Sequence, residues 1–266
     1  MKIVFLCFLA LHVVHSIAAG RQKRRAALAG DAGTTRDSET SAAGTETAPE
    51  GGEPLGDKPQ RVSPLATLIH GPLFIMACYY GFQHDVWSRQ LISPVYIALG
   101  LVLGHAIFAF SLTFIHHSLR EGWEILVDVR DLWRFTFDAP AVLSRFISVA
   151  VGEEVIWRVA AQPILSGLLE SAALGIVLVA ILFSLCHDHF FNNTFMVGAE
   201  FVVFALILGG MYYVTSSLIL VILVHALRDI EIAYLEFCAK VAEYGDRERA
   251  SAFIDQSYAM AKMQRS

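Results

Sequence analysis

The chain has 266 residues, of which 55% are hydrophobic and 17% are charged, and its mean hydropathy is +0.53. Soluble domains rarely combine so much apolar mass with so little charge, so these values exclude an ordinary cytosolic enzyme. The net charge is −5 and the sequence has no basic patch. We therefore expect no nucleic-acid partner.

Residues 1–20 have the layout of a secretory signal peptide, because Lys2 is followed by an apolar stretch from Ile3 to Val14 and then by small residues. The alternative is a retained signal anchor. Four basic residues follow between positions 21 and 25, and because they outweigh Lys2 they would hold the next segment in the cytosol. The sequence leaves both alternatives open.

Residues 21–63 change composition abruptly, and the stretch from Ala26 to Gln60 consists mainly of Ala, Gly, Thr, Glu and Pro. Its only large apolar residues are Leu28 and Leu55. Such a segment cannot bury enough surface to offset the entropy lost on ordering. We therefore predict a disordered tether at residues 21–63.

Six apolar spans follow, each close to the roughly 20 residues that cross the hydrocarbon core of a bilayer. They are Leu65–Phe82, Leu91–Ile115, Ala141–Leu169, Ser171–His187, Val197–Tyr213 and Ser216–Leu235. In lipid the backbone must satisfy its own hydrogen bonds, so these spans are expected to be helices. The sequence therefore predicts an all-α, polytopic membrane helix bundle with about six core transmembrane helices plus the N-terminal segment. We assign residues 64–236 to this membrane domain and residues 237–266 to a polar C-terminal tail.

The segment from Gly122 to Phe137 alternates apolar residues with acids and arginines at a spacing that suits one amphipathic helix lying in the membrane interface. Fifteen Lys and Arg residues lie in the tether, in the loop before the third span and in the tail, whereas Arg89 is alone on the opposite side. By the positive-inside rule we expect tether and tail in the cytosol. A cleaved signal peptide would invert that placement. We expect an integral membrane protein of the endoplasmic reticulum, another endomembrane or the plasma membrane.

The third span carries three charged residues, Glu153, Glu154 and Arg158. Each costs about 2.5–3.5 kcal/mol at mid-bilayer depth unless it is paired or functional. Glu154 and Arg158 are four residues apart and share a helix face, which favours a structural ion pair. Glu153 points about 100° away from Glu154 and has no partner in its own helix. We therefore expect Glu153 to face a cavity in the bundle.

Two further spans contain ionisable side chains. His187 ends the fourth span, while His225 and Asp229 are four residues apart on one face of the sixth. Taken alone, each fits a structural role, as a helix cap or as a His–Asp pair. We expect three other groups to be structural: His70, His105 and Glu200, the first two packed in the core and the third interfacial.

Taken together, Glu-Glu-x-x-x-Arg, Phe-x-x-x-His and His-x-x-x-Asp, each on its own helix, resemble the CPBP family. This family groups type II CAAX prenyl endopeptidases with lysostaphin-resistance-protein-A-like, bacteriocin-processing and immunity proteins. The resemblance covers about residues 144–230 and includes the Gly209-Gly210-Met211-Tyr212-Tyr213 stretch. It implies a glutamate-type intramembrane endopeptidase acting on a membrane-associated protein or a lipidated peptide, such as the CAAX tail of prenylated proteins, without a cofactor.

The resemblance also implies roles for individual residues. Glu153 would be the general base that activates water, assisted by His187. His225 and Asp229 would stabilise the oxyanion, while Glu154 and Arg158 match positions with a supporting role. The chemistry is coherent, because peptide hydrolysis needs a polarised water, a base and a donor aimed at the developing oxyanion.

The sequence departs from the family pattern at three positions. Asp229 stands where the family often has Asn, and an ionised carboxylate there would repel an oxyanion. Asp229 must therefore be protonated, or it orients His225 and does not contact the oxyanion. Trp157 and Val159 stand where the family often has Phe and Gly. Val159 removes a small residue that permits close helix approach.

Three other functions stay open from the sequence. Glu153, His187, His225 and Asp229 are an acceptable zinc set, although the sequence has no H-E-x-x-H motif. A non-catalytic member that binds or sequesters a partner would fit the Asp229 departure. A small transporter or proton conduit would use the buried acids and histidines as a relay.

Overall fold

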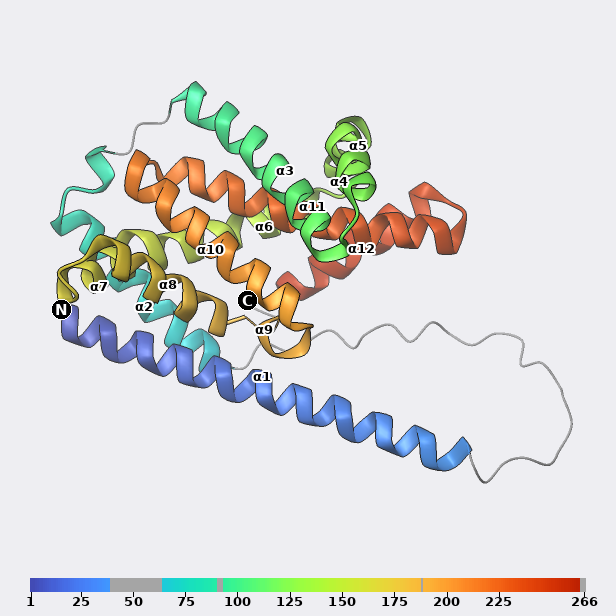
Figure 1. Cartoon of the computed structure of the whole chain (residues 1–266), viewed down its shortest axis with the longest axis horizontal. Helices are drawn as coiled ribbons and strands as arrows, with labels where there is room; N and C mark the ends of the chain where they lie inside the picture. The colour runs from blue at the N-terminus through green and yellow to red at the C-terminus, as the bar shows by residue number, and fades with distance from the viewer. Residues whose placement is uncertain (39–63, 90–92, 188, 264–266) are drawn as a thin grey trace, which may run out of the picture.

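The computed structural model describes residues 1–38, 64–89, 93–187 and 189–263, and within these ranges the chain is helical and has no β-strand. This confirms the predicted all-α class (Figure 1). The elements are α1 (Lys2–Ser38), α2 (Pro64–Gln83), η1 (Trp87–Arg89), α3 (Pro94–His116), α4 (Leu119–Val127), α5 (Val129–Asp138), α6 (Pro140–Glu154), η2 (Val155–Ala161), α7 (Gln162–Leu168), α8 (Ala172–Leu185), α9 (His189–Asn192), α10 (Phe195–Thr215), α11 (Leu218–Tyr244) and α12 (Arg247–Met263).

Four helices of the described ranges are long and apolar enough to cross a membrane, which fits an integral membrane protein. They are Lys2–Arg25, Leu65–Gln83, Pro94–His116 and Phe195–Thr215. The other three predicted spans are also helical, but they carry charged residues or, in α8, are short. The charged helices are the ones expected to carry the site.

The third predicted span is a continuous helical run whose middle section, η2, winds as a π-helix. The sequence pattern predicted an ordinary helix there. A π-helix is rare, appears mostly as a short bulge inside an α-helix, and is frequent at functional sites. It starts at Val155, directly after Glu153 and Glu154, and all of its seven residues are buried.

Helix α8 is shorter than its predicted span and ends at Leu185. Its 14 residues rise about 21 Å, less than the roughly 30 Å of the hydrocarbon core. His187 therefore lies two residues beyond the end of the helix, and its side chain is 21% exposed.

Helix α11 is the central helix and packs against both α3 and α6 (Figure 1). Two glycines of α3 make close approach to α11 possible. A Cβ atom on Gly100 would lie 2.8 Å from the Cβ of Leu223, and one on Gly104 would lie 3.1 Å from the Cα of Val224. Helices α8 and α10 pack side by side, so α6, α8, α10 and α11 surround a common interior.

Helix α1 packs along α2, α8 and α9 and buries Phe5, Leu9 and Val13 in the main core. It continues to Ser38, so residues 21–38, which we predicted to be part of a disordered tether, are helical. The physical reason is that the first part of this segment is rich in Ala, the strongest helix former, and extends an existing helix. Residues 39–63, the rest of the predicted tether, lie outside the described residues.

The predicted interfacial helix is two helices, α4 and α5, which meet at Asp128. The break has a tertiary cause, because Oδ2 of Asp128 accepts a hydrogen bond of 2.6 Å from the hydroxyl of Tyr234 in α11. Trp123 and Trp133 are exposed on this unit. The amphipathic character that we predicted for the segment is therefore present on two helices.

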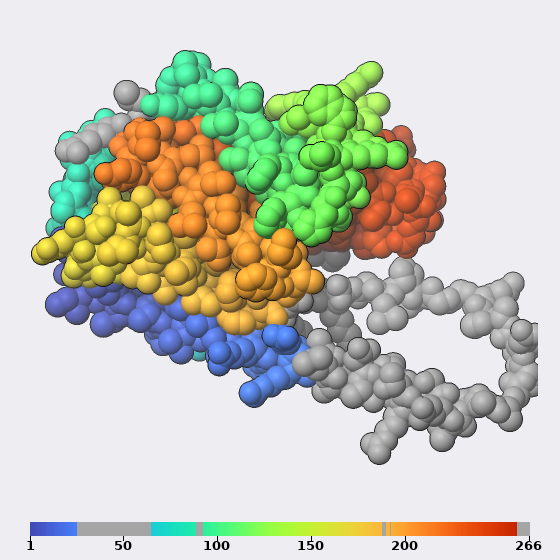
Figure 2. All heavy atoms as spheres, viewed as in Figure 1, coloured from blue at the N-terminus to red at the C-terminus, as the bar shows by residue number. Residues whose placement is uncertain are grey.

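The C-terminal tail is folded. Helix α11 continues past residue 236, so the predicted domain boundary falls inside it, and α12 turns back at Gly245 to pack on α5, α6 and α11. Figure 2 shows this end of the molecule beside α4 and α5. Ala250 and Ile254 of α12 are fully buried in a second core cluster. Oδ1 of Asp255 accepts a hydrogen bond of 2.6 Å from the backbone N–H of Ala141, which caps the start of α6.

Candidate active site

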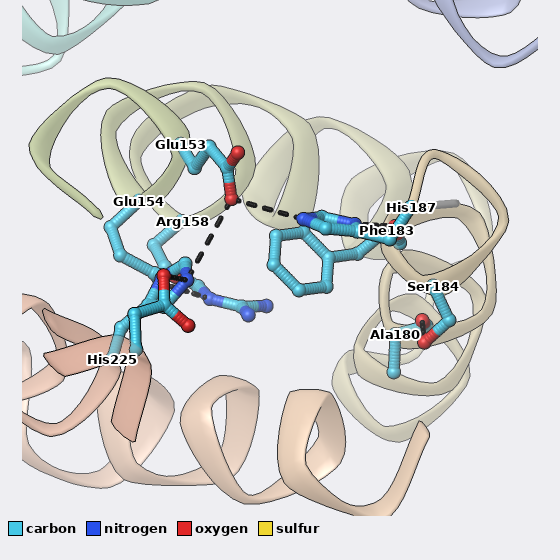
Figure 3. Close-up of polar contacts among 9 residues, drawn as sticks. Glu153, Glu154, Arg158, Ala180, Phe183, Ser184, His187 and His225 are labelled. Atoms are coloured by element: carbon cyan, nitrogen blue, oxygen red, sulfur yellow. Dashed lines mark hydrogen bonds and ion pairs between the residues drawn. The ribbon is translucent and has the colours of Figure 1, made fainter. Parts of the chain in front are cut away.

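Glu153 lies in the last turn of α6, and its carboxylate faces two imidazole rings, that of His187 just after α8 and that of His225 in α11 (Figure 3). Its Oε2 atom is 3.3 Å from Nε2 of His187 and 3.7 Å from Nε2 of His225. The Glu153 side chain keeps 19% of its surface exposed. An acid and two histidines that are far apart in sequence therefore meet at one place.

The backbone fixes the orientation of the His187 ring. Its Nδ1 atom lies 2.8 Å from the carbonyl oxygen of Phe183, one turn earlier in the chain. Because a carbonyl only accepts, Nδ1 carries the proton and donates it. The other nitrogen, Nε2, is then the atom presented to Glu153, as an acceptor when the ring is neutral.

His225 is surrounded by three carboxylates. Nδ1 lies 2.8 Å from Oε1 of Glu154, while Nε2 lies 3.7 Å from Oε2 of Glu153 and 3.6 Å from Oδ2 of Asp229. The ring is only 3% exposed. The Glu154 contact fixes the orientation of the ring and leaves Nε2 facing the Glu153 carboxylate.

A chain of buried polar contacts holds Glu154 in place. Nε of Arg158 donates a hydrogen bond of 2.8 Å to Oε2 of Glu154, and both side chains are 0% exposed. Gln162 continues the chain, because its Oε1 accepts from Arg158 at 3.4 Å and its Nε2 donates to the carbonyl of Gly209 at 3.0 Å. A Cβ on Gly209 would lie 3.3 Å from that Oε1, so the glycine lets α10 approach. The predicted Glu154–Arg158 pair is therefore present and connects α6 with α10 and α11.

An aromatic ring separates the two histidines. The ring of Phe183 lies 4.5 Å from that of His187 and 5.8 Å from that of His225, centroid to centroid. Trp157, which replaces the family's Phe, packs edge-on against the same ring at 5.6 Å. The Phe of the Phe-x-x-x-His motif thus forms an apolar wall of the site.

The Val159 departure has a structural counterpart on the facing helix. A Cβ on Gly81 of α2 would lie 2.8 Å from Cγ1 of Val159 and 2.7 Å from the ring of Trp87. The small residue that close packing needs is therefore on α2 instead of η2. The indole of Trp87 also donates a hydrogen bond of 3.1 Å to the carbonyl of Cys78.

Glu153 borders a cavity of about 610 Å³ between α1, α2 and α6. Its polar lining residues are His12, Thr67, His70, Arg145, Ser148 and Glu153. The rings of His12 and His70 meet edge to face at 5.5 Å. Our expectation that His70 is a packed core residue is therefore wrong, and His12 was missed, because only the packing of α1 onto α2 places it at the cavity.

One other expectation changes and one holds. Glu200, expected at the interface, is 5% exposed, accepts a hydrogen bond of 2.6 Å from Ser111 and pairs with Arg228 at 2.8 Å. His105 lies in the bundle as expected, 2.6 Å from Oε1 of Glu231. The Glu200 contacts connect α10 with α3 and α11, and the His105 contact connects α3 with α11, so these groups are structural.

The structure brings together all four residues that the sequence selected as catalytic, with their two supporting residues. Within the described ranges, no group of three or more His, Cys, Asp and Glu side chains has the geometry of a metal site. The arrangement offers a carboxylate, an imidazole whose free nitrogen faces it, and a second imidazole oriented by an acid. These groups can activate a water molecule and stabilise an anion.

Comparison with models of protein families matches residues 135–230 to the Rce1-like family, which is described as type II CAAX prenyl endopeptidase. The matched range runs from α5 to α11 and contains every predicted site residue. No curated protein and no solved structure matches the chain.

Proposed function

We propose that this protein is a glutamate-type intramembrane endopeptidase that hydrolyses a peptide bond in the C-terminal tail of a prenylated, membrane-held substrate, because residues 135–230 match the Rce1-like family of type II CAAX prenyl endopeptidases. The observation that carries the proposal is the position of the Glu153 carboxylate, which lies between His187 and His225 on the wall of a cavity inside the bundle.

Glu153 and His187 share the task of activating water. The carboxylate takes a proton from a water molecule in the cavity, and Nε2 of His187, 3.3 Å away, accepts that proton or passes it to the leaving amine. The carbonyl of Phe183 holds Nδ1, so the same ring nitrogen serves both steps. The apolar wall keeps bulk solvent away, which strengthens each of these interactions.

His225 stabilises the oxyanion. With Nδ1 held by Glu154 at 2.8 Å, a proton on Nε2 points toward the region between Glu153 and Asp229. In this proposal the ring is the donor to the developing oxyanion, while Asp229 orients the ring and does not itself donate. This role removes the conflict between a carboxylate at position 229 and a negatively charged intermediate.

The site is reached from the end of the molecule that carries the positive charges. Glu153 lies 13 residues, about 20 Å, from the start of α6 at Pro140. The start of α6 follows directly on α5, which lies with α4 and α12 at one end of the molecule (Figure 1). By the positive-inside rule this side faces the cytosol, where lipidated tails are presented.

A cleavage assay with the purified chain in lipid nanodiscs and a farnesylated CAAX peptide tests the proposal. Glu153→Gln is expected to lower the cleavage rate by about 10²–10⁴-fold, because it removes the general base with little change in shape. His187→Gln is expected to lose about 10²-fold or more. The matched controls are Glu170→Gln and His116→Gln, both exposed outside the site, and they should keep the wild-type rate.

The same assay separates the alternatives. Full activity of Glu153→Gln would refute the proposed mechanism. Loss of activity on removal of zinc by a strong chelator, and its return with added zinc, would assign the same residues to a metal centre. Absence of cleavage by the wild type, together with binding of the peptide, would indicate a non-catalytic member that sequesters its partner.

A further inference from the structure

The cavity beside Glu153 contains one residue that the proposed chemistry does not use, Arg145 of α6. Among the described residues that line the cavity, Glu153 is the only acid, whereas Arg145, His12 and His70 are basic. A pocket of about 610 Å³ has the size of a small-ligand site, and the guanidinium of Arg145 gives it one place for a negatively charged group.

Arg145 and Glu153 lie on the same strip of α6. The lining positions 145, 148, 149, 152 and 153 follow the three- and four-residue spacing of one helix face. Arg145 and Glu153 are eight positions apart, which corresponds to about 12 Å along the helix axis. The cavity therefore has an acid near the end of α6 and a positive charge nearer the start of α6.

This spacing fits a short peptide with a free C-terminus. A C-a-a-X tail cut after its cysteine loses three residues, and three extended residues span at most about 10–11 Å. From the axial match we propose that Arg145 binds the C-terminal carboxylate of the substrate and so sets which peptide bond lies at Glu153. This inference rests on the proposed function and assigns the substrate-binding end of its site.

The surroundings of Arg145 hold its side chain in place. Its guanidinium carbon lies 5.4 Å from the centre of the Tyr258 ring in α12, and that ring packs against Phe146 at 5.3 Å. Burial and then the nearby Glu236 carboxylate raise the pKa of Tyr258, so the phenol stays neutral. A stacked guanidinium keeps its planar donors in a fixed orientation, which suits two parallel hydrogen bonds to a carboxylate.

The test compares two farnesylated peptides that differ only at the C-terminus, one with a free carboxylate and one with a carboxamide. Wild type is expected to cleave the acid about 10–100-fold more efficiently, as kcat/KM, because the amide lacks the charge that a buried guanidinium recognises. Arg145→Gln should cleave both peptides at the slower rate of the amide. Arg145→Lys should keep part of the preference for the free carboxylate, since lysine keeps the positive charge but cannot donate the two parallel hydrogen bonds of a guanidinium.

The matched control is Arg134→Gln, at an exposed position of α5, which should keep the wild-type preference. Equal cleavage of the two peptides by wild type would overturn the inference without any variant, as would a preserved preference in Arg145→Gln. If neither peptide is cleaved, the proposed function fails. Binding of the two peptides to Glu153→Gln then decides the inference, which expects the acid to bind at least about 10-fold tighter.

Discussion

Replacing the buried pair Glu154–Arg158 separates its structural role from its catalytic role. Glu154→Gln leaves the guanidinium of Arg158 buried, 0% exposed, without its ionised partner. Removing one member of such a pair costs about 3–5 kcal/mol. The two carboxylate oxygens of Glu154 contact Nε of Arg158 and Nδ1 of His225, at 2.8 Å each. The side-chain amide of Gln has a single oxygen and can accept only at one of these two places. We therefore expect a less stable protein with little activity.

The double variant Glu154→Met/Arg158→Met makes the prediction specific. Replacing a buried ion pair by apolar residues is often neutral for stability, so thermal unfolding in nanodiscs should recover much of the loss. Nδ1 of His225 and Oε1 of Gln162 lose their partners, so the double variant should stay about 1–3 kcal/mol below wild type. Cleavage should stay reduced by about 10²-fold or more, because His225 has lost the acceptor that orients it. Wild-type cleavage by a stably folded double variant would refute the claim that Glu154 positions His225.

Three further predictions follow from packing. Gly81→Ala should destabilise the bundle, because the new Cβ would lie 2.8 Å from Val159. Gly71→Ala should not, because no atom lies within 4 Å of its Cβ position. Thermal unfolding compares the two variants. Deleting residues 1–20 should abolish cleavage, because α1 covers apolar residues of the core and forms one wall of the cavity, and full activity of the truncated chain would contradict this. Asp255→Ala should lower stability by about 1 kcal/mol through loss of the cap on α6, as measured by chemical unfolding.

The candidate residues could be selected from the sequence because each motif is a short pattern within or at the end of one apolar span, whereas only the fold shows that the three motifs meet. Charged residues inside apolar spans are costly, which made Glu153, His187 and His225 stand out. Helical spacing then indicated which charges pair, and the pair of Glu154 with Arg158 is present as predicted.

The missed features depend on contacts between distant segments. His12 and His70 look like ordinary residues of apolar helices, and only the packing of α1 on α2 places their rings at the cavity. The cap that Asp255 gives to α6 joins positions 114 residues apart. Neither relation leaves a periodic signal in the sequence.

The predicted tether shows a different limit. Mean composition over a long segment hid the Ala-rich start of that segment, which continues α1 to Ser38. The fourth predicted span extends to His187, two residues past Leu185, where α8 ends. Hydropathy measures apolar length and does not show where the backbone stops being helical.

The most direct test of the account follows the oxygen of the attacking water. A farnesylated CAAX peptide is incubated in ¹⁸O-labelled water with purified wild type and, in parallel, with Glu153→Gln, and the products are analysed by mass spectrometry. The account predicts one ¹⁸O atom in the new carboxylate of the farnesyl-cysteine product from wild type and no product above background from Glu153→Gln. Cleavage by Glu153→Gln at the wild-type rate would contradict it.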